Sequence, residues 1–108
     1  MVKKAIIVSV KKYLNELLKI GIPVQYAILF GSQVQNKRAD RLSDIDLLII
    51  SPRYDGEYNR EDINLLWRAA ARTDSRIEPV PVGLKRWETD DESTIIELAR
   101  REGIQISV

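Results

Sequence analysis

The feature of the sequence that most constrains the fold is the apolar run Leu47–Ile50, which directly follows Asp44-Ile45-Asp46. A short apolar run without polar alternation favours a strand that is buried on both faces in the middle of a sheet. Pro52 ends this strand, since proline has no N–H for a sheet ladder. Side chains two residues apart in a strand point to the same face, so Asp44 and Asp46 are expected side by side at its start.

The rest of the pattern predicts helices that cover a small mixed sheet, an α/β fold of the α+β type. Gly21 stops the first helix, and two prolines in the third strand favour a place at the sheet edge. The length of 108 residues fits one domain, 1–108. We expect helices over 5–20, 60–72 and 92–101, strands over 24–30, 44–51 and 77–82, a loop or short helix over 31–42, a loop over 52–59, and a short strand or tail over 104–108.

The composition narrows the possible chemistry. The chain has neither cysteine nor histidine, so catalysis depends on carboxylates, hydroxyls, Lys or Arg, and a metal held by oxygen atoms. A net charge of +1 argues against nucleic-acid or membrane binding through bulk charge, although a local basic patch at 36–38 and Arg41 stays open. No segment is long enough to span a membrane, and the N-terminus lacks a cleavage site, so a cytoplasmic location is expected.

A Gly-Ser pair after the first strand and the two aspartates before the second point to phosphate chemistry. Gly31 lets the backbone turn sharply and approach a phosphate, and Ser32 can donate its amide and hydroxyl to phosphate oxygens. Two adjacent carboxylates repel each other unless a cation lies between them. Mg2+ takes carboxylate oxygens and keeps waters and substrate phosphates as its other ligands. These residues therefore predict metal-dependent phosphoryl or nucleotidyl transfer.

Phe30-Gly31-Ser32 followed by Ser43-Asp44-Ile45-Asp46 resembles the signature of the DNA polymerase β-like nucleotidyltransferases, and the small size resembles their minimal members in bacteria and archaea. The resemblance implies the nucleotidyltransferase fold and a third carboxylate on the next strand, for which this sequence offers Glu78. It also implies ATP as substrate and two Mg2+ ions. The implied ligands are Asp44, Asp46 and Glu78 for the metal, and Gly31, Ser32, Lys37 and Arg38 for the nucleotide.

Two positions depart from the family pattern. Where many members have a basic residue and then glycine, this chain reads Val34-Gln35-Asn36-Lys37-Arg38, about one residue longer. Asn36 tolerates the left-handed conformation, and Lys37 or Arg38 is expected to contact phosphate in a shifted register. The third carboxylate is glutamate where aspartate is more usual, which moves its oxygens by about 1 Å.

The resemblance implies transfer of AMP from ATP to an acceptor hydroxyl on a partner protein, a HEPN-domain toxin, with this chain as the antitoxin. The alternative is a non-catalytic subunit that neutralises a HEPN partner by binding, and a third option is transfer to a small molecule such as an aminoglycoside. The sequence also leaves a homo-oligomer open.

Several of these residues have alternative, purely structural interpretations. Asp44 and Asp46 are then polar residues at a strand end, Glu78 is an exposed residue of an edge strand, and Ser32 is a helix cap. Lys37, Arg38 and Arg41 are then solvated loop charges. Trp67 and Trp87 are interpreted as core or interface residues, and Tyr54 and Tyr58 lie in a loop where stacking on a nucleobase stays open.

Overall fold

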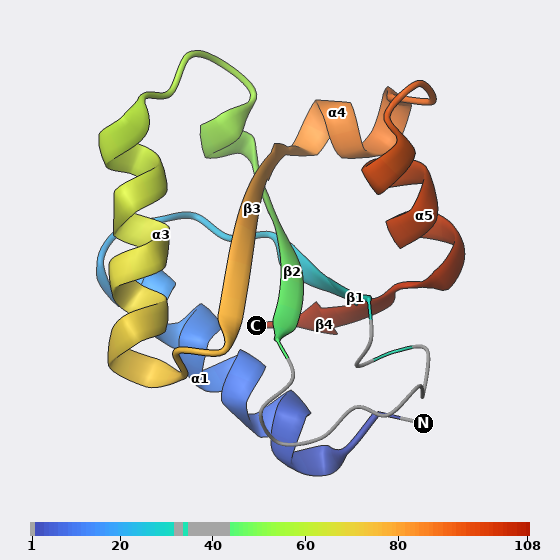
Figure 1. Cartoon of the computed structure of the whole chain (residues 1–108). Helices are drawn as coiled ribbons and strands as arrows, with labels where there is room; N and C mark the ends of the chain where they lie inside the picture. The colour runs from blue at the N-terminus through green and yellow to red at the C-terminus, as the bar shows by residue number, and fades with distance from the viewer. Residues whose placement is uncertain (1, 32–33, 35–43) are drawn as a thin grey trace.

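The computed structural model describes residues 2–31, 34 and 44–108, and in it helices cover both faces of a four-stranded sheet (Figure 1). The predicted α/β class of fold is confirmed. The elements in chain order are α1 (Lys4–Lys19), β1 (Tyr26–Phe30), β2 (Ile45–Ser51), the 3-10 helix η1 (Pro52–Tyr54), α3 (Arg60–Thr73), β3 (Ile77–Gly83), α4 (Leu84–Thr89), α5 (Thr94–Glu102) and β4 (Ile104–Ser107).

The sheet has the strand order β3-β2-β1-β4. Strand β2 is parallel to β3 and antiparallel to β1, and α3 supplies the crossover that a parallel pair requires. The central place of β2 confirms the prediction from the apolar run. The edge place of β3 confirms the prediction from Pro79 and Pro81. Strand β4 pairs with β1, so the residues after Gly103 form a strand and not a free tail.

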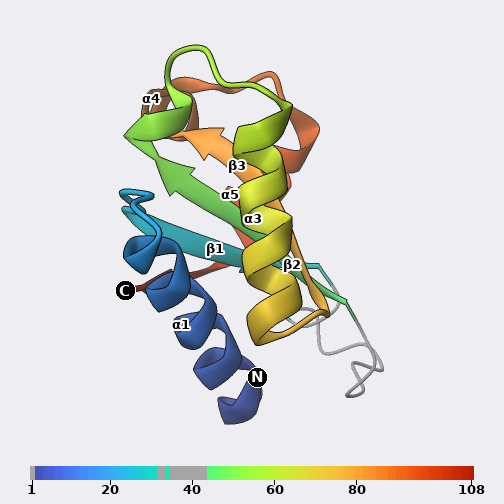
Figure 2. The ribbon, with the colours of Figure 1, turned by 90° about the vertical axis from the view of Figure 1, so that its left-hand side faces the viewer.

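Alternate residues of β2 feed two separate cores, which explains why its apolar run is continuous. Leu47 and Ile49 pack under α1 and α3, and Leu48 and Ile50 pack under α5 on the other face. Figure 2 shows α1 and α3 in front of the sheet and α4 and α5 behind it. Within the described part of the chain, none of the helices is both long and apolar enough to cross a membrane.

The sequence interpretation missed α4, which begins directly after β3. Its start is fixed by a distant residue, because the Oδ1 atom of Asp55 accepts a hydrogen bond from the Lys85 amide at 2.9 Å. A Cβ atom on Gly83 would lie 2.4 Å from this same Oδ1 atom. The end of α4 is held by Arg100 of α5, whose Nε donates to the Trp87 carbonyl at 2.9 Å. These contacts are tertiary, so local sequence could not indicate them.

Tyr13 is a buried polar link between α1 and α3. Its side chain is fully buried, and its hydroxyl donates to the Leu66 carbonyl at 3.0 Å. We expect Tyr13→Phe to lower the free energy of unfolding by about 1 kcal/mol, since a buried carbonyl loses one donor. Urea denaturation measures this change. Tyr58→Phe, at an exposed position, is the control and is expected to change little; equal effects of the two substitutions would contradict the assignment.

Candidate active site

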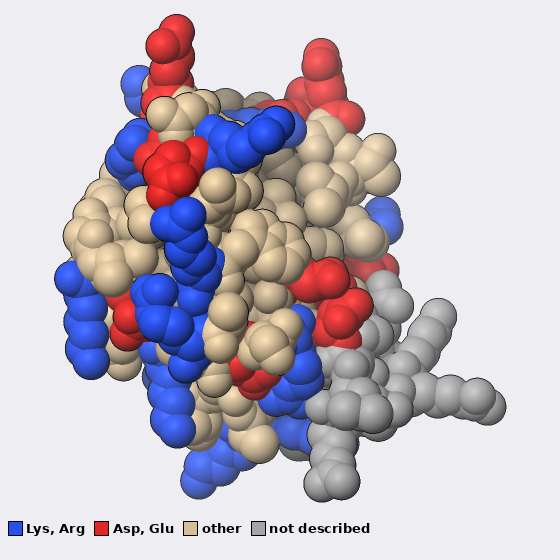
Figure 3. Space-filling model, turned by 60° about the vertical axis from the view of Figure 1, so that its left-hand side comes forward, with Lys and Arg blue, Asp and Glu red and all other residues tan. Residues whose placement is uncertain are grey.

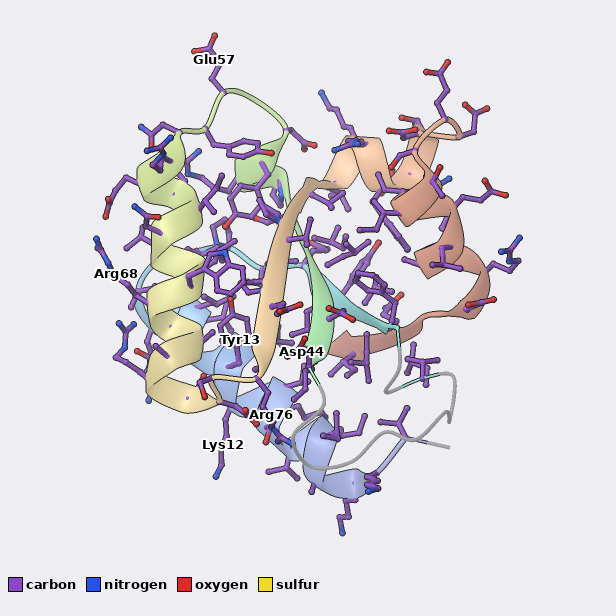
Figure 4. All side chains as sticks on the ribbon, viewed as in Figure 1. Lys12, Tyr13, Asp44, Glu57, Arg68 and Arg76 are labelled. Atoms are coloured by element: carbon purple, nitrogen blue, oxygen red, sulfur yellow. The ribbon has the colours of Figure 1, made fainter. Side chains whose placement is uncertain are left out.

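Three strands bring the predicted site residues to one end of the sheet. In the register of the ladders, Asp46 pairs with Phe30 of β1 on one side and with Glu78 of β3 on the other. Asp44 precedes β2 by one residue and is exposed, whereas Asp46 and Glu78 are half-buried. Figure 4 shows Asp44 at the lower end of β2, where the strand begins. The carboxylates of adjacent strands therefore meet at the start of β2 and β3.

Gly31, directly after β1, borders the carboxylates on the side opposite β3. Its φ angle is +81°, in the left-handed region that favours glycine. A Cβ atom at Gly31 would lie 2.4 Å from the Oδ2 atom of Asp46, which is closer than nonbonded atoms approach. Glycine is therefore required twice, for the backbone turn after β1 and for the space that the Asp46 carboxylate occupies.

The electrostatics of the site are those of crowded carboxyl groups. The pKa of Glu78 is raised above its ordinary value of 4.5, first by a hydrogen bond with Asp46 and then by burial. The negative charges of Asp44 and Asp46 and a hydrogen bond with Asp44 raise the pKa further. Such a cluster favours a shared proton or a bound cation over full ionisation.

The donor set suits a hard cation, because every candidate ligand here is a carboxylate oxygen. Among the residues that the structure describes, no three Asp, Glu, His or Cys side chains already stand in the arrangement of a metal site. The hydrogen bonds of Glu78 to both aspartates occupy oxygens that a metal would take. The three carboxylates therefore fit Mg2+ in their chemistry, and metal binding would replace these hydrogen bonds.

Not every predicted residue is placed at this end. Ser32, Lys37, Arg38 and Arg41 lie outside the described residues. Tyr54 is buried, only 5% exposed, and meets the ring of Tyr58 edge-on at 5.3 Å, so the interpretation of Tyr54 as a nucleobase-stacking residue is wrong.

The two tryptophans differ in exposure. Trp67 is 46% exposed on α3, so it is not a core residue. Trp87 packs against the core under α5, with the Arg100 guanidinium over its ring at 5.4 Å. Of the two tryptophans, only Trp87 therefore has the predicted core role.

Positive charge gathers on a different part of the molecule. Helix α1 exposes four lysines, Lys4, Lys11, Lys12 and Lys19, while its Glu16 pairs with Arg72 of α3 at 3.1 Å. Figure 3 shows Lys and Arg side chains along the left and lower part of the molecule, with some Asp and Glu side chains among them and others at its centre right. Although the net charge is close to zero, α1 is therefore basic and the end of the sheet with Asp44, Asp46 and Glu78 is acidic.

Two residues at the rim of the site were missed. The Arg76 carbonyl accepts a hydrogen bond from the Ile45 amide at 2.8 Å, which joins the starts of β2 and β3. The Arg76 side chain pairs with Asp74 at 2.6 Å. The spacing Asp74-Ser75-Arg76 before a strand is the available signal, because aspartate often accepts the amide two residues on.

The raised pKa of Glu78 makes stability depend on pH. The metal-free folded protein holds this proton more tightly than the unfolded chain, so ionisation of Glu78 destabilises the fold as the pH rises above 4.5. Glu78→Gln removes this loss of stability, because glutamine does not ionise. In urea denaturation with EDTA, we expect the variant to gain stability relative to the parent chain from pH 4.5 upward. A difference that stays constant with pH would contradict the carboxyl cluster.

Comparisons with known proteins agree with this arrangement. The sequence profile described as "Nucleotidyltransferase domain" matches residues 7–101. The chain belongs to the nucleotidyltransferase domain family. A search among curated proteins found no match.

Two solved structures have a similar fold. The first is described as a crystal structure of a toxin-antitoxin with AMP-PNP; it has 25% sequence identity and a TM-score of 0.61, over 89% of this chain and 70% of that chain. The second is described as the toxin-antitoxin MntA-HepT, with 21% identity and a TM-score of 0.57, over 92% of this chain and 69% of that chain. The second likeness shows the fold alone. The nucleotidyltransferase fold implied by the sequence is confirmed.

Proposed function

We propose that this protein transfers AMP from ATP to an acceptor hydroxyl on a partner protein, a HEPN-type toxin, and thereby acts as its antitoxin. The observation that carries the proposal is the convergence of Gly31, Asp46 and Glu78, in which the glycine leaves room for one carboxylate and the next strand supplies another. Family membership supports the reaction type. The similar structure described as a toxin-antitoxin with AMP-PNP supports the nucleotide and the partner.

Asp44, Asp46 and Glu78 are the residues that would hold Mg2+. When bound, the ion would supply positive charge that neutralises the triphosphate and the leaving pyrophosphate. The protein's part is to keep three carboxylates together on two adjacent strands despite their repulsion. The cores on both faces of β2 provide the rigidity for this, since a packed strand resists separation of the charges at its start.

Other residues of the chain would act on the nucleotide and the acceptor. The backbone at Gly31 and the amide and hydroxyl of Ser32 would bind phosphate oxygens, and Lys37 or Arg38 would pair with phosphate charge. Glu78 is the available group to accept the proton of the acceptor hydroxyl, because the chain has no histidine to act as the base. The acceptor oxygen forms a bond to the α-phosphorus, the bond from that phosphorus to the β-phosphate bridge breaks, and pyrophosphate leaves.

The proposal is tested with ATP labelled at the α-phosphate, Mg2+, the purified chain and the product of the adjacent gene. We expect the label to appear on the partner protein, and to be absent when ATP carries the label at the γ-phosphate. This pair of substrates separates adenylyl transfer from phosphoryl transfer. A stable complex without label transfer, equally stable with Asp44→Asn, would contradict the enzyme and support the binding subunit. Labelled GTP in parallel tests base preference.

A further inference from the structure

The backbone of an arginine lies next to the strand ends that carry the carboxylate cluster. Arg76 precedes β3 by one residue, and its carbonyl bonds the Ile45 amide, which places Arg76 beside the start of β2 and Asp44. Glu78 follows two residues later on the same segment. Figure 4 shows Arg76 and Asp44 at the same end of the sheet. A guanidinium at this place could form an ion pair with Asp44 or with Glu78.

Asp74 binds the Arg76 side chain through both carboxylate oxygens. Its Oδ1 atom accepts from the Arg76 amide and from Nε, each at 3.0 Å, and its Oδ2 atom accepts from a terminal guanidinium nitrogen at 2.6 Å. The side chains of Arg76 and Asp74 are only 25% and 14% exposed. Such a bidentate, partly buried pair fixes the direction of the guanidinium as well as its charge.

Asp74 is itself held toward the α1 face of the sheet. Its amide donates to the Ala70 carbonyl at 2.8 Å, its carbonyl accepts from the Ile77 amide at 3.0 Å, and its carboxylate is hydrogen-bonded by Ser9 of α1. Asp46 and Glu78 belong to the opposite face, because Leu48 and Val80, two residues after each, pack in the core under α5. Asp74, which binds the guanidinium, is thus anchored to α3 and α1, the helices that cover the opposite face.

We propose that Asp74 is a positioning residue that keeps the Arg76 guanidinium from pairing with Asp44 and Glu78, so that a divalent cation can bind there. The inference rests on the metal role of these carboxylates in the proposed function. Without Asp74, Arg76 competes with the metal for the same oxygens. An ion pair at a partly exposed site is worth up to about 1 kcal/mol, so the competition amounts to about fivefold in metal affinity.

The test measures Mn2+ binding to the full chain by electron paramagnetic resonance of the free ion, with no nucleotide and no turnover. Asp74→Asn is expected to raise the dissociation constant about fivefold, because asparagine keeps the oxygen for the Arg76 amide but loses the charged bidentate grip. Asp74→Asn combined with Arg76→Gln is expected to return the constant to within about twofold of the parent value. Asp90→Asn, which breaks the Arg86 pair at 2.9 Å, is the matched control and leaves Mn2+ binding unchanged.

Arg76→Gln alone separates positioning from a merely structural role. It breaks the same pair as Asp74→Asn but also removes the competing cation, so Mn2+ binding stays at the parent level or becomes tighter. Weak binding by Arg76→Gln, or by the double variant, would overturn the inference, as would unchanged binding by Asp74→Asn. If the parent chain binds no Mn2+ at all, the metal role in the proposed function fails first. Thermal melts of each variant confirm that the fold is retained.

Discussion

Asp46→Asn is expected to lower the rate of adenylyl transfer about 1,000-fold, since several kcal/mol of charge stabilisation by the metal are lost. Asp46 lies between Phe30 of β1 and Glu78 of β3, and the other two carboxylates of the site, Asp44 and Glu78, are already proposed as metal ligands. The metal-free variant is expected to melt at or above the temperature of the parent chain, because one of the crowded charges is gone. Label transfer at saturating Mg2+ and a thermal melt measure the two effects.

Asp91→Asn is the control for this substitution, because Asp91 is exposed in the connection between α4 and α5. It is expected to retain full transfer. Retention of transfer within about tenfold by Asp46→Asn would show that the metal is held elsewhere. A lower melting temperature with proportional loss of transfer would show that Asp46 serves the fold.

Gly31→Ala is expected to lower transfer about 100-fold, because a misplacement of about 1 Å in a reacting constellation has an effect of this size. The added Cβ atom would meet Asp46 Oδ2 at 2.4 Å, so the carboxylate must move. The left-handed backbone at φ +81° adds a strain of about 1–2 kcal/mol in stability. Transfer kinetics and urea denaturation, done on the same preparation, measure the two consequences separately.

Gly21→Ala is a matched control for Gly31→Ala. Gly21 has a φ angle of +92°, and a Cβ atom there would meet nothing within 4 Å. The backbone strain is thus similar, but no carboxylate is displaced. We expect a similar loss of stability with unchanged transfer. Equal losses of transfer in the two variants would mean that backbone strain, and not the contact with Asp46, explains the effect of Gly31→Ala.

The main elements could be predicted because their signals are local. The apolar run of β2, the glycine that ends α1 and the two prolines of β3 are each read within one element, and the structure agrees with the predicted bounds within a few residues at most ends. Nucleobase stacking was left open for Tyr54 because its loop setting gave no hint that it is buried in the core with residues of α1 and α3. Helix α4 was missed because Asp55, thirty residues earlier, supplies its cap.

The sequence by itself determined which residue types were available for the site and their spacing along the chain. It placed Asp44 and Asp46 at the head of a buried strand, and the absence of histidine left carboxylates as the available metal ligands. Only the tertiary structure decided that Glu78 stands beside Asp46, that Gly31 leaves room for the Asp46 carboxylate, and that Asp74 holds Arg76 aside. The physical reason is that strand register and close contact arise from packing between distant segments, and a single segment carries no record of its neighbours.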